Sequence, residues 1–381
     1  MALIDKLTNI ADAIRTKTGK TALLTLDAMP TEIQSISGGG GGGIPSEFLT
    51  ISGFCTYRFA YNGWNWFINE YGNQITTSNV DRMGYMFYES DKLEYIPFEI
   101  NCVQASQDIG SVFAGCKSLK EVPKINNICP KNMGKLFNQC YQLRYLPEDF
   151  ASWFDWKEHD NATGGYACEK SYLFANCNSL RSVPMEVLAH SNPYSTYSYS
   201  YFNNGFTYCY ALDELVELPV PYIKSSWTSN AFSSMLQNCS RLQRVTFALN
   251  NGQPYVVSWK SQSIDLSSYL GYASNTGNII NNNSGITADK EVTDDATYQA
   301  LKNDPDWFTC NAAYCRYNHD SAVETINSLP DTSAYLATAG GTNTIKFRGA
   351  AGNLTDGGAV NTLTEEEIAV AAAKGWTVSI V

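Results

Sequence analysis

The chain has 381 residues, a formal net charge of −11 and only 17% charged residues, whereas aromatic residues make up 13% and tyrosines number 24. An acidic chain without a basic stripe is a poor partner for nucleic acid or for an anionic membrane, so we expect neither. Eleven cysteines form an odd set without a closely spaced framework, which argues against a disulfide-stapled secreted domain. The sequence contains no window of 18 apolar residues and no recognisable secretory signal, so we expect synthesis in a cytoplasm and no membrane insertion.

Residues 3–18 are predicted to form an amphipathic helix, whose apolar stripe consists of Leu3, Leu7, Ile10 and Ile14. A stripe this narrow needs a partner helix, either in this chain or in another copy of it. A second short helix is expected at 27–36. The six glycines at 38–43 cannot hold regular structure cheaply and are expected to form a hinge. Residues 1–37 are therefore predicted to be an attachment or self-association segment.

Residues 44–80 alternate like a strand and are unusually aromatic. A terminal coil of a repeat protein must hide one of its faces from water. We therefore expect this segment to cap the N-terminal end of the repeats that follow.

One pattern, Phe-x-x-Cys-x-x-Leu-x-x-Val-Pro, recurs with variations in residues 81–258. Its copies close at positions 97, 123, 147, 184, 219 and 246, so the period is 24 to 27 residues with two insertions of about ten. A unit this short cannot bury its apolar edge alone and must stack on its neighbours, which predicts an α/β repeat solenoid of the leucine-rich-repeat type. Cysteine in the repeated slot is interpreted as a small apolar side chain between coils. The expected repeat core is Phe87, Leu93, Phe113, Cys116, Leu119, Phe137, Cys140, Leu143, Phe174, Cys177, Leu180, Cys239 and Leu242.

The remainder is predicted to be a polar linker with short strands at 259–320 and a small α+β module at 321–381. A helix should begin at Ser321 and stop near Pro330, and a strand is expected at 344–347. Thr364 and Glu367 form a capping box for a last helix, with Leu363 and Ile368 as its hydrophobic staple. That helix should end at Gly375, followed by a strand at 376–380.

Two aromatic insertions are the candidate ligand-binding segments. Tyrosine offers a broad contact area at low entropic cost, and its ring face suits sugar or peptide. The alternative is that alternate tyrosines pack on the flank of the repeats themselves. The candidates are Trp153 and Trp156 in the first insertion and Tyr194, Tyr197, Tyr199, Tyr201 and Phe202 in the second.

Catalysis and metal binding are not expected. Asp149, Asp155, Glu158 and Asp160 are close in sequence, but nothing in their spacing brings two of them onto one face as a hydrolase requires. Cys310, Cys315 and His319, with Asp320, resemble half of a zinc site that lacks its second half. We therefore expect no cofactor and no metal.

The repeated units resemble the BspA-type leucine-rich repeats of bacterial surface proteins and of phages of gut and oral bacteria. The ending LTEEEIAVAAAKGWTVSIV, with LPD at 329–331, is similar to a terminal module of the phage-borne versions. The beginning, LxDKLTNIADAIRTKTGKT followed by MPTEIQSI, resembles the N-terminal segment of tail and fibre proteins of phages that infect Firmicutes.

The resemblance implies a tail-associated, non-enzymatic receptor-binding protein, located in the virion. Residues 1–37 would contact other tail or baseplate proteins or copies of the same chain, giving a homo-oligomer, and the solenoid would recognise a bacterial surface glycan or protein. Three alternatives stay open: a purely structural tail decoration, a bacterial surface adhesin, and an envelope depolymerase.

Overall fold

The protein is described by a computed structural model that covers residues 46–103, 108–155, 168–189, 203–219, 244–250, 319–347 and 363–380, with shorter pieces between 235 and 312. The predicted helices at 3–18 and 27–36 and the glycine run at 38–43 lie outside the described residues. Within the described part no helix is long and apolar enough to cross a membrane.

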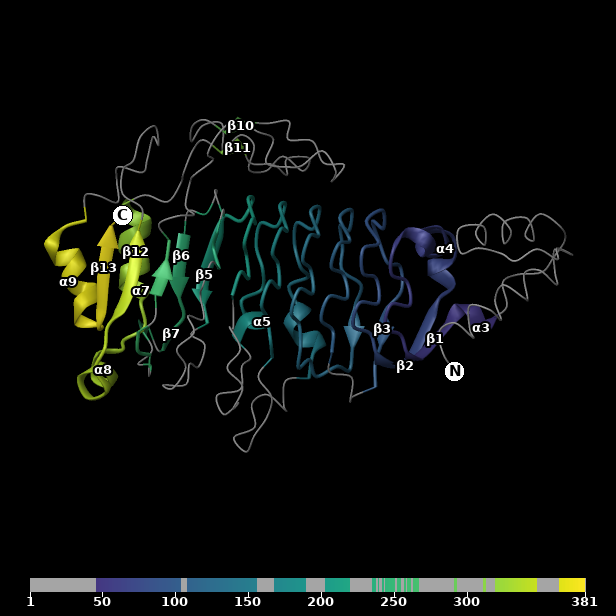
Figure 1. Cartoon of the computed structure of the whole chain (residues 1–381), viewed down its shortest axis with the longest axis horizontal. Helices are drawn as coiled ribbons and strands as arrows, with labels where there is room; N and C mark the ends of the chain where they lie inside the picture. Colours follow the sequence, from purple (N-terminus) through teal and green to yellow (C-terminus); the bar gives the residue numbers. More distant parts are fainter. Residues whose placement is uncertain are drawn as a thin grey trace, which may run out of the picture.

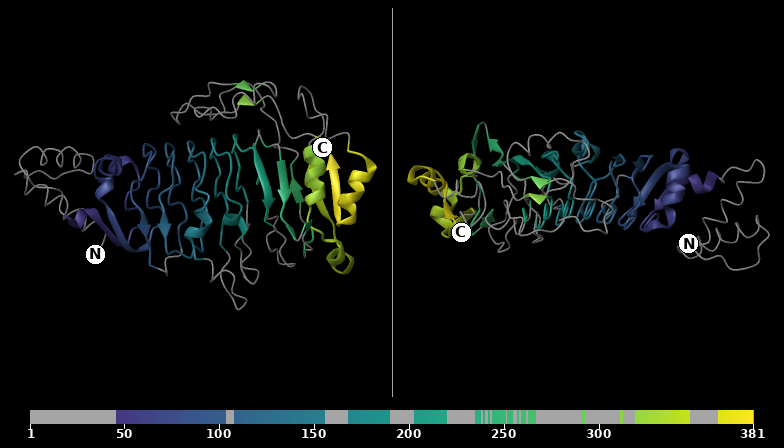
Figure 2. Two further views of the ribbon diagram at one scale, coloured as in Figure 1. Left: turned by 180° about the vertical axis from the view of Figure 1, so that it is seen from behind. Right: turned by 90° about the horizontal axis from the view of Figure 1, so that it is seen from above.

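The described chain forms an elongated row of coils that lie side by side along the long axis (Figures 1 and 2). Neighbouring coils pair in parallel, as in β1 with β2, β3 with β4 and β5 with β6. Isolated parallel bridges such as Ile128 to Phe154 and Asn132 to Glu169 join coils that have no regular strand. We propose that this row is the leucine-rich-repeat-like solenoid that the sequence predicts.

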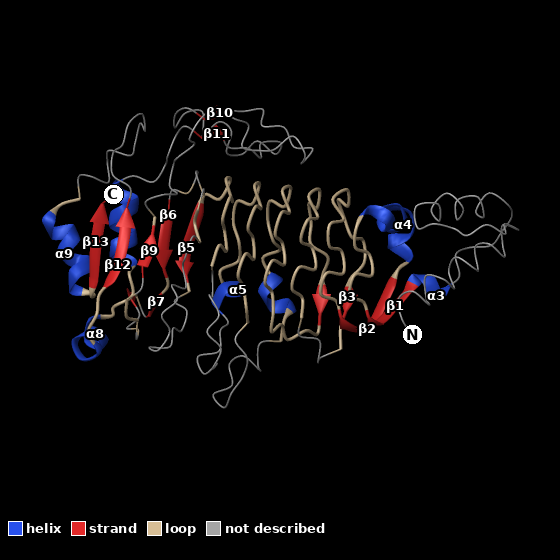
Figure 3. Cartoon of the chain, in the orientation of Figure 1, coloured by secondary structure: helices blue, strands red, loops and turns tan. Residues whose placement is uncertain are grey.

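The regular elements are short, and most of the coil path is loop and turn (Figure 3). The helices are α3 Ser46–Leu49, α4 Asn65–Tyr71, α5 Glu186–Ala189, α7 His319–Ser328, α8 Ser333–Ala339 and α9 Glu365–Ala373. The strands are β1 Thr50–Phe54, β2 Thr76–Arg82, β3 Ile100–Asn101, β4 Ile125–Asn126, β5 Glu214–Leu218, β6 Arg244–Phe247, β7 Leu249–Asn250, β8 Gln253–Pro254, β9 Ser263–Asp265, β10 Glu291–Val292, β11 Asn311–Ala312, β12 Asn343–Phe347 and β13 Trp376–Ile380.

A stack of phenylalanine rings forms the centre of the row. Neighbouring rings are 5.4–5.6 Å apart between centroids and nearly parallel. Every residue predicted for the repeat core is fully buried. The stack also contains two residues that the sequence analysis did not assign to it, Phe59 and Phe206. Its members in chain order are Phe59, Phe87, Phe113, Phe137, Phe174 and Phe206.

The backbone around each stacked phenylalanine alternates between two kinds of hydrogen bond. At Phe87, the N–H groups of Tyr85, Phe87 and Glu89 donate to carbonyls of the next coil, at 2.8–3.2 Å. The N–H groups between them, on Met86 and Tyr88, donate three residues back within their own coil. Both sets of donors are thereby satisfied in a buried turn, as a close-packed stack requires.

This alternation requires left-handed backbone two residues before and two residues after each stacked phenylalanine. Around Phe87 the residues are Tyr85 (φ 62°) and Glu89 (φ 55°). The same pair of positions has positive φ around every other member of the stack, from Tyr57 and Tyr61 to Asn204 and Tyr208. We call these positions the left-handed slots.

The repeated cysteines form hydrogen bonds between neighbouring coils in addition to filling the space between them. Each thiol donates to the carbonyl of the stacked phenylalanine in the preceding coil, as in Cys140 Sγ to Phe113 O (3.2 Å) and Cys177 Sγ to Phe137 O (3.0 Å). Ser90 occupies the same slot in the second coil, and its hydroxyl lies 2.7 Å from Phe59 O. Burial raises the pKa of these thiols, that of Cys140 well above its ordinary value, so they stay protonated and able to donate.

The N-terminal boundary of the row differs from the predicted one. Phe59 stacks on Phe87, and its N–H donates to Met86 O, so part of segment 44–80 is itself a coil. Helix α4, within the segment predicted as the cap, lies at this end of the described row (Figure 1), and its Phe67 and Ile68 are buried. Phe59 was not assigned to the repeats because cysteine and leucine are missing from the positions that follow it.

The C-terminal module is built on a parallel sheet of order β13-β12-β9. Strand β9 and the buried Trp259 belong to this module, although the sequence places them in a linker. The capping box of Thr364 and Glu367 is present at the start of α9. The sequence analysis missed α8, which lacks an apolar stripe and has no buried residue.

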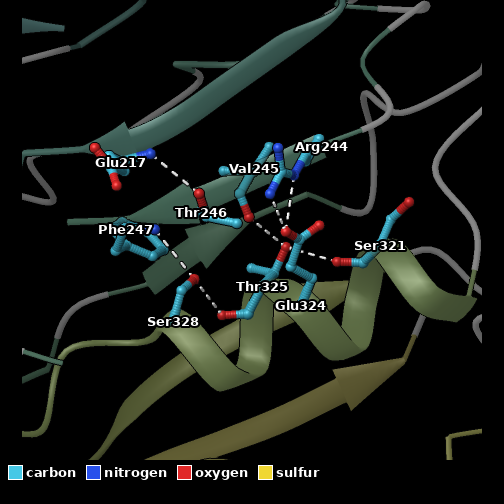
Figure 4. A network of polar contacts seen from close by, with 9 residues as sticks. All are labelled: Glu217, Arg244, Val245, Thr246, Phe247, Ser321, Glu324, Thr325 and Ser328. Atoms are coloured by element: carbon cyan, nitrogen blue, oxygen red, sulfur yellow. Dashed lines mark hydrogen bonds and ion pairs between the residues drawn. The ribbon is translucent and has the colours of Figure 1, made fainter. Parts of the chain in front are cut away.

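Helix α7 docks the module onto the last strand of the row, β6 (Figure 4). The Thr325 hydroxyl lies 2.6 Å from Val245 O, and Phe247 N donates to Ser328 Oγ at 3.0 Å. An ion pair between Arg244 and Glu324 lies at the rim, with both side chains about 40% exposed. The buried bonds are expected to contribute more than this solvated pair.

The thiol bond is tested by substitution of Cys140. Alanine removes the donor and should lower the free energy of unfolding by about 1–2 kcal/mol, whereas valine overfills the slot and should cost about 1–3 kcal/mol. Serine keeps a donor, as Ser90 does, and should be at least as stable as alanine. Urea unfolding midpoints of the three variants measure this order. A serine variant less stable than alanine would mean that the slot buries the hydroxyl without a partner.

The docking contact is tested by comparing Ser328→Ala with Glu324→Gln. The first removes the acceptor of a buried N–H and should cost about 1–3 kcal/mol, and the second weakens an exposed ion pair and should cost less than about 1 kcal/mol. Hydrogen exchange at β6 should accelerate in Ser328→Ala only. Equal effects of the two substitutions would contradict this ranking.

Candidate binding surface

Most of the predicted ligand-binding residues lie outside the described residues, namely Trp156, Tyr194, Tyr197, Tyr199, Tyr201 and Phe202, as do Leu3, Leu7, Ile10 and Ile14 of the predicted attachment segment. Trp153 is described, and only 9% of its surface is exposed. Its ring packs edge to face on Phe150, with centroids 5.1 Å apart. Trp153 is therefore a packing residue of the coil and does not present its ring to a ligand.

A cluster of four tyrosines lies on the first two coils of the row, and we call it the tyrosine cluster: Tyr57, Tyr61, Tyr85 and Tyr88. Tyr57 and Tyr85 stack with centroids 4.9 Å apart and planes at 13°. The ring of Tyr88 meets the other three in edge-to-face contacts at 5.4–6.4 Å. Tyr57, Tyr61 and Tyr85 are 42%, 53% and 37% exposed, so their rings form a continuous aromatic surface in contact with solvent.

Three of the four tyrosines occupy left-handed slots, which makes them costly choices. Their φ values are 57° at Tyr57, 63° at Tyr61 and 62° at Tyr85. A left-handed backbone costs a residue with a Cβ roughly 1–2 kcal/mol, and glycine or asparagine lowers this cost. Equivalent slots in other coils hold Gly115 and Asn176 but also Lys135 and Tyr172, so the positive φ, which the hydrogen bonds of every coil require, does not single out these tyrosines. What distinguishes the cluster is that its rings contact one another and three of them remain exposed.

Polar groups border the cluster. Asn62 follows Tyr61 and donates to the carboxylate of Asp91, and it also accepts from Asn65 Nδ2 at 2.6 Å. The pKa of Tyr88 is raised by its hydrogen bond to the exposed Glu89 and by desolvation. Partial desolvation, with Tyr85 and Tyr61 nearby, raises the pKa of Tyr57. The hydroxyls of Tyr57 and Tyr88 are therefore neutral at physiological pH, and the surface combines aromatic rings with amide and carboxylate acceptors.

Other exposed tyrosines have a different environment. A cation lies over the ring of Tyr95 (Lys120, 5.7 Å) and over that of Tyr172 (Lys135, 5.7 Å), and Arg181 reaches the hydroxyl of Tyr145. No described Lys or Arg lies over a ring of the tyrosine cluster. The cluster thus differs from single surface tyrosines that an adjacent coil already partners.

The cluster was not predicted from the sequence, although the tyrosines around two of the phenylalanines can be seen there. Tyr85 and Tyr57 each stand two residues before a stacked phenylalanine, whereas Tyr88 directly follows Phe87 and Tyr61 stands two residues after Phe59. Because Phe59 was assigned to a cap, the two sets were not aligned. Without that alignment, residues 28 positions apart give no indication that their rings stack.

The carboxylates and the metal half-site give no catalytic centre in the described residues. Asp149 and Asp155 are described, whereas Glu158, Asp160, Cys310 and Cys315 are not. His319 lies 3.2 Å from Asp320 through Nδ1 and 3.2 Å from Glu367 through Nε2, so it joins the beginnings of α7 and α9. No group of three metal-ligating side chains is found in the described part of the chain.

Comparison with protein-family models, with curated proteins and with solved structures finds no match for this chain.

The His319 contact predicts a pH-dependent step. Hydrogen bonds to Asp320 and then Glu367 raise the pKa of His319 above its ordinary value near 6.5. A raised folded pKa stabilises the contact fully below the unfolded value, and this contribution is lost as the pH rises through the folded value. NMR titration of His319 should give a pKa above 6.5 that falls in Asp320→Asn and in Glu367→Gln. An unchanged pKa in both variants would contradict the assignment.

Proposed function

We propose that the chain is a non-enzymatic, tail-associated protein of a phage that recognises a component of the bacterial cell surface. Residues 1–37 would attach it to other tail proteins or to further copies, and the row of coils would present the recognition surface.

The observation that carries the proposal is an exposed aromatic surface on a long, rigid row of coils. Aromatic residues are enriched where proteins bind partners, because they offer large contact area at low entropic cost. The resemblance of the N-terminal segment and the repeats to phage tail proteins supports the biological setting.

Attachment through several copies of the chain would compensate for a modest affinity of each single site. A surface of this size on one chain gives moderate affinity, and several copies on one particle raise the effective concentration of each further site. The net charge of −11 argues against recognition through an anionic polymer. The proposal therefore favours a neutral surface component, bound by several chains together.

Binding of the purified full chain to intact cells tests the proposal. A panel of gut Firmicutes and Bacteroidetes should contain a few strains that retain the labelled protein, while most do not. Cell-associated fluorescence at increasing protein concentration measures this, with bovine serum albumin as the control for adhesion. Retention by no strain, including a host of the parent phage, would favour a structural tail component. Release of oligosaccharide from the cells would favour a depolymerase.

A further inference from the structure

We infer that the tyrosine cluster is a binding site for a neutral glycan of the bacterial surface, and that it, rather than the aromatic insertions, is the main recognition site. This inference rests on the proposed function and names its ligand class and location.

The cluster offers the two kinds of contact that a sugar uses. The C–H face of a sugar ring packs on an aromatic face, and its hydroxyl groups need acceptors and donors beside that face. Tyr57 and Tyr85 stack face to face with centroids 4.9 Å apart, so each ring covers one face of the other, and their exposed fractions of 42% and 37% leave the outer parts of the rings for a sugar. Asn62 and Asp91 provide an amide and a carboxylate next to Tyr61.

Charge selects among glycans. The described residues place no cation over the cluster, and Glu89 and Asp91 border it. An anionic polymer would meet the carboxylates of Glu89 and Asp91 at this edge, where Lys92, whose N–H donates to Asn62, is the adjacent cation. A neutral polysaccharide meets only hydrogen-bonding partners, so the site favours it over an anionic one.

The backbone beneath the cluster argues against a peptide as the ligand. Peptides commonly bind by adding a strand to a free sheet edge, by filling a helix groove or by docking on a polyproline groove. Here the Tyr61 N–H donates to Tyr88 O, the Tyr85 N–H to Gly110 O and the Tyr88 N–H to Tyr85 O. These donors are committed to the coils, so a peptide main chain cannot pair with them.

A bound cation is also disfavoured by the ring arrangement. An aromatic cage needs ring faces that surround an open space. Tyr57 and Tyr85 contact each other face to face, and the edge-to-face contacts of Tyr88 reach all three other rings. The rings are packed against one another and offer an outer surface.

The test replaces all three left-handed tyrosines by asparagine, as Tyr57→Asn, Tyr61→Asn and Tyr85→Asn in the full chain. Asparagine tolerates the left-handed backbone, and Asn176 and Asn204 already occupy such slots. Asparagine relieves the backbone strain but removes the ring contacts of the cluster. Binding is therefore compared at a temperature at which circular dichroism shows both chains to be folded, so that lost binding cannot be assigned to unfolding. The matched control is Tyr95→Asn, Tyr145→Asn and Tyr172→Asn, which removes three tyrosines of comparable exposure (46%, 52% and 38%).

The readout is binding to a retaining strain, with cells untreated, oxidised by periodate or digested with proteinase K. Periodate cleaves the vicinal diols of sugars, and the protease removes surface proteins. We expect the cluster variant to lose about tenfold or more in affinity and the control variant less than about twofold. Parent binding should be abolished by periodate and unaffected by the protease.

Three results would overturn the inference. Binding removed by the protease and not by periodate identifies a protein receptor. If the cluster variant binds as well as the parent and substitution of Tyr197, Tyr199 and Tyr201 abolishes binding, the recognition site lies in the second insertion and not in the tyrosine cluster. If the parent chain binds no strain, the proposed function fails. Binding to an array of purified neutral and anionic bacterial polysaccharides then tests the glycan site on its own. The inference is then overturned unless a neutral polysaccharide on that array binds the parent chain and not the cluster variant.

Discussion

The structure depends on the alternating hydrogen bonds around each stacked phenylalanine. Every second N–H crosses to the next coil, and the intervening N–H closes a turn within its own coil. This arrangement satisfies a buried backbone without long strands, which explains why most of the row is loop (Figure 3). It also fixes the spacing between coils, because the phenylalanine rings and the thiol-to-carbonyl bonds must fit the same step. The 5.4–5.6 Å separation of the rings and the 3.0–3.2 Å thiol contacts are two measures of one spacing.

The same constraint determines where the surface is free to vary. The residue at each stacked position must be large and apolar, and the following slot must be small and able to donate a hydrogen bond. The left-handed slots require only a backbone conformation, and their side chains range from Gly115 to Lys135 and Tyr172. These slots are therefore the positions at which the side chain can change with the least effect on the packing between coils. The cost is backbone strain of roughly 1–2 kcal/mol for each residue with a Cβ, and a long row with many satisfied contacts tolerates it.

The sequence was most informative where its signal is periodic and local. The positions of Phe113, Cys116 and Leu119 could be aligned with those of later copies, and these residues are fully buried. Phe206 stands three residues before Cys209, where the repeat places a phenylalanine, but the prediction for that copy began only at Cys209. The role of the thiols was beyond reach, because the acceptor of Cys177 is a carbonyl 40 residues away. The burial of Trp153 was equally hidden, since an aromatic residue in an insertion has the same appearance whether it packs or binds.

The tyrosine cluster shows how such a miss arises. Its members are ordinary in sequence, because tyrosine is the commonest aromatic residue of this chain. They become unusual only when two facts are combined: their rings contact one another across two coils, and three of the four rings remain exposed. A buried tyrosine with positive φ would be explained by packing, and an exposed tyrosine in a strand would need no explanation. A group of tyrosines that contact one another while three of their rings stay exposed has neither explanation, and a ligand that uses the rings supplies the missing one.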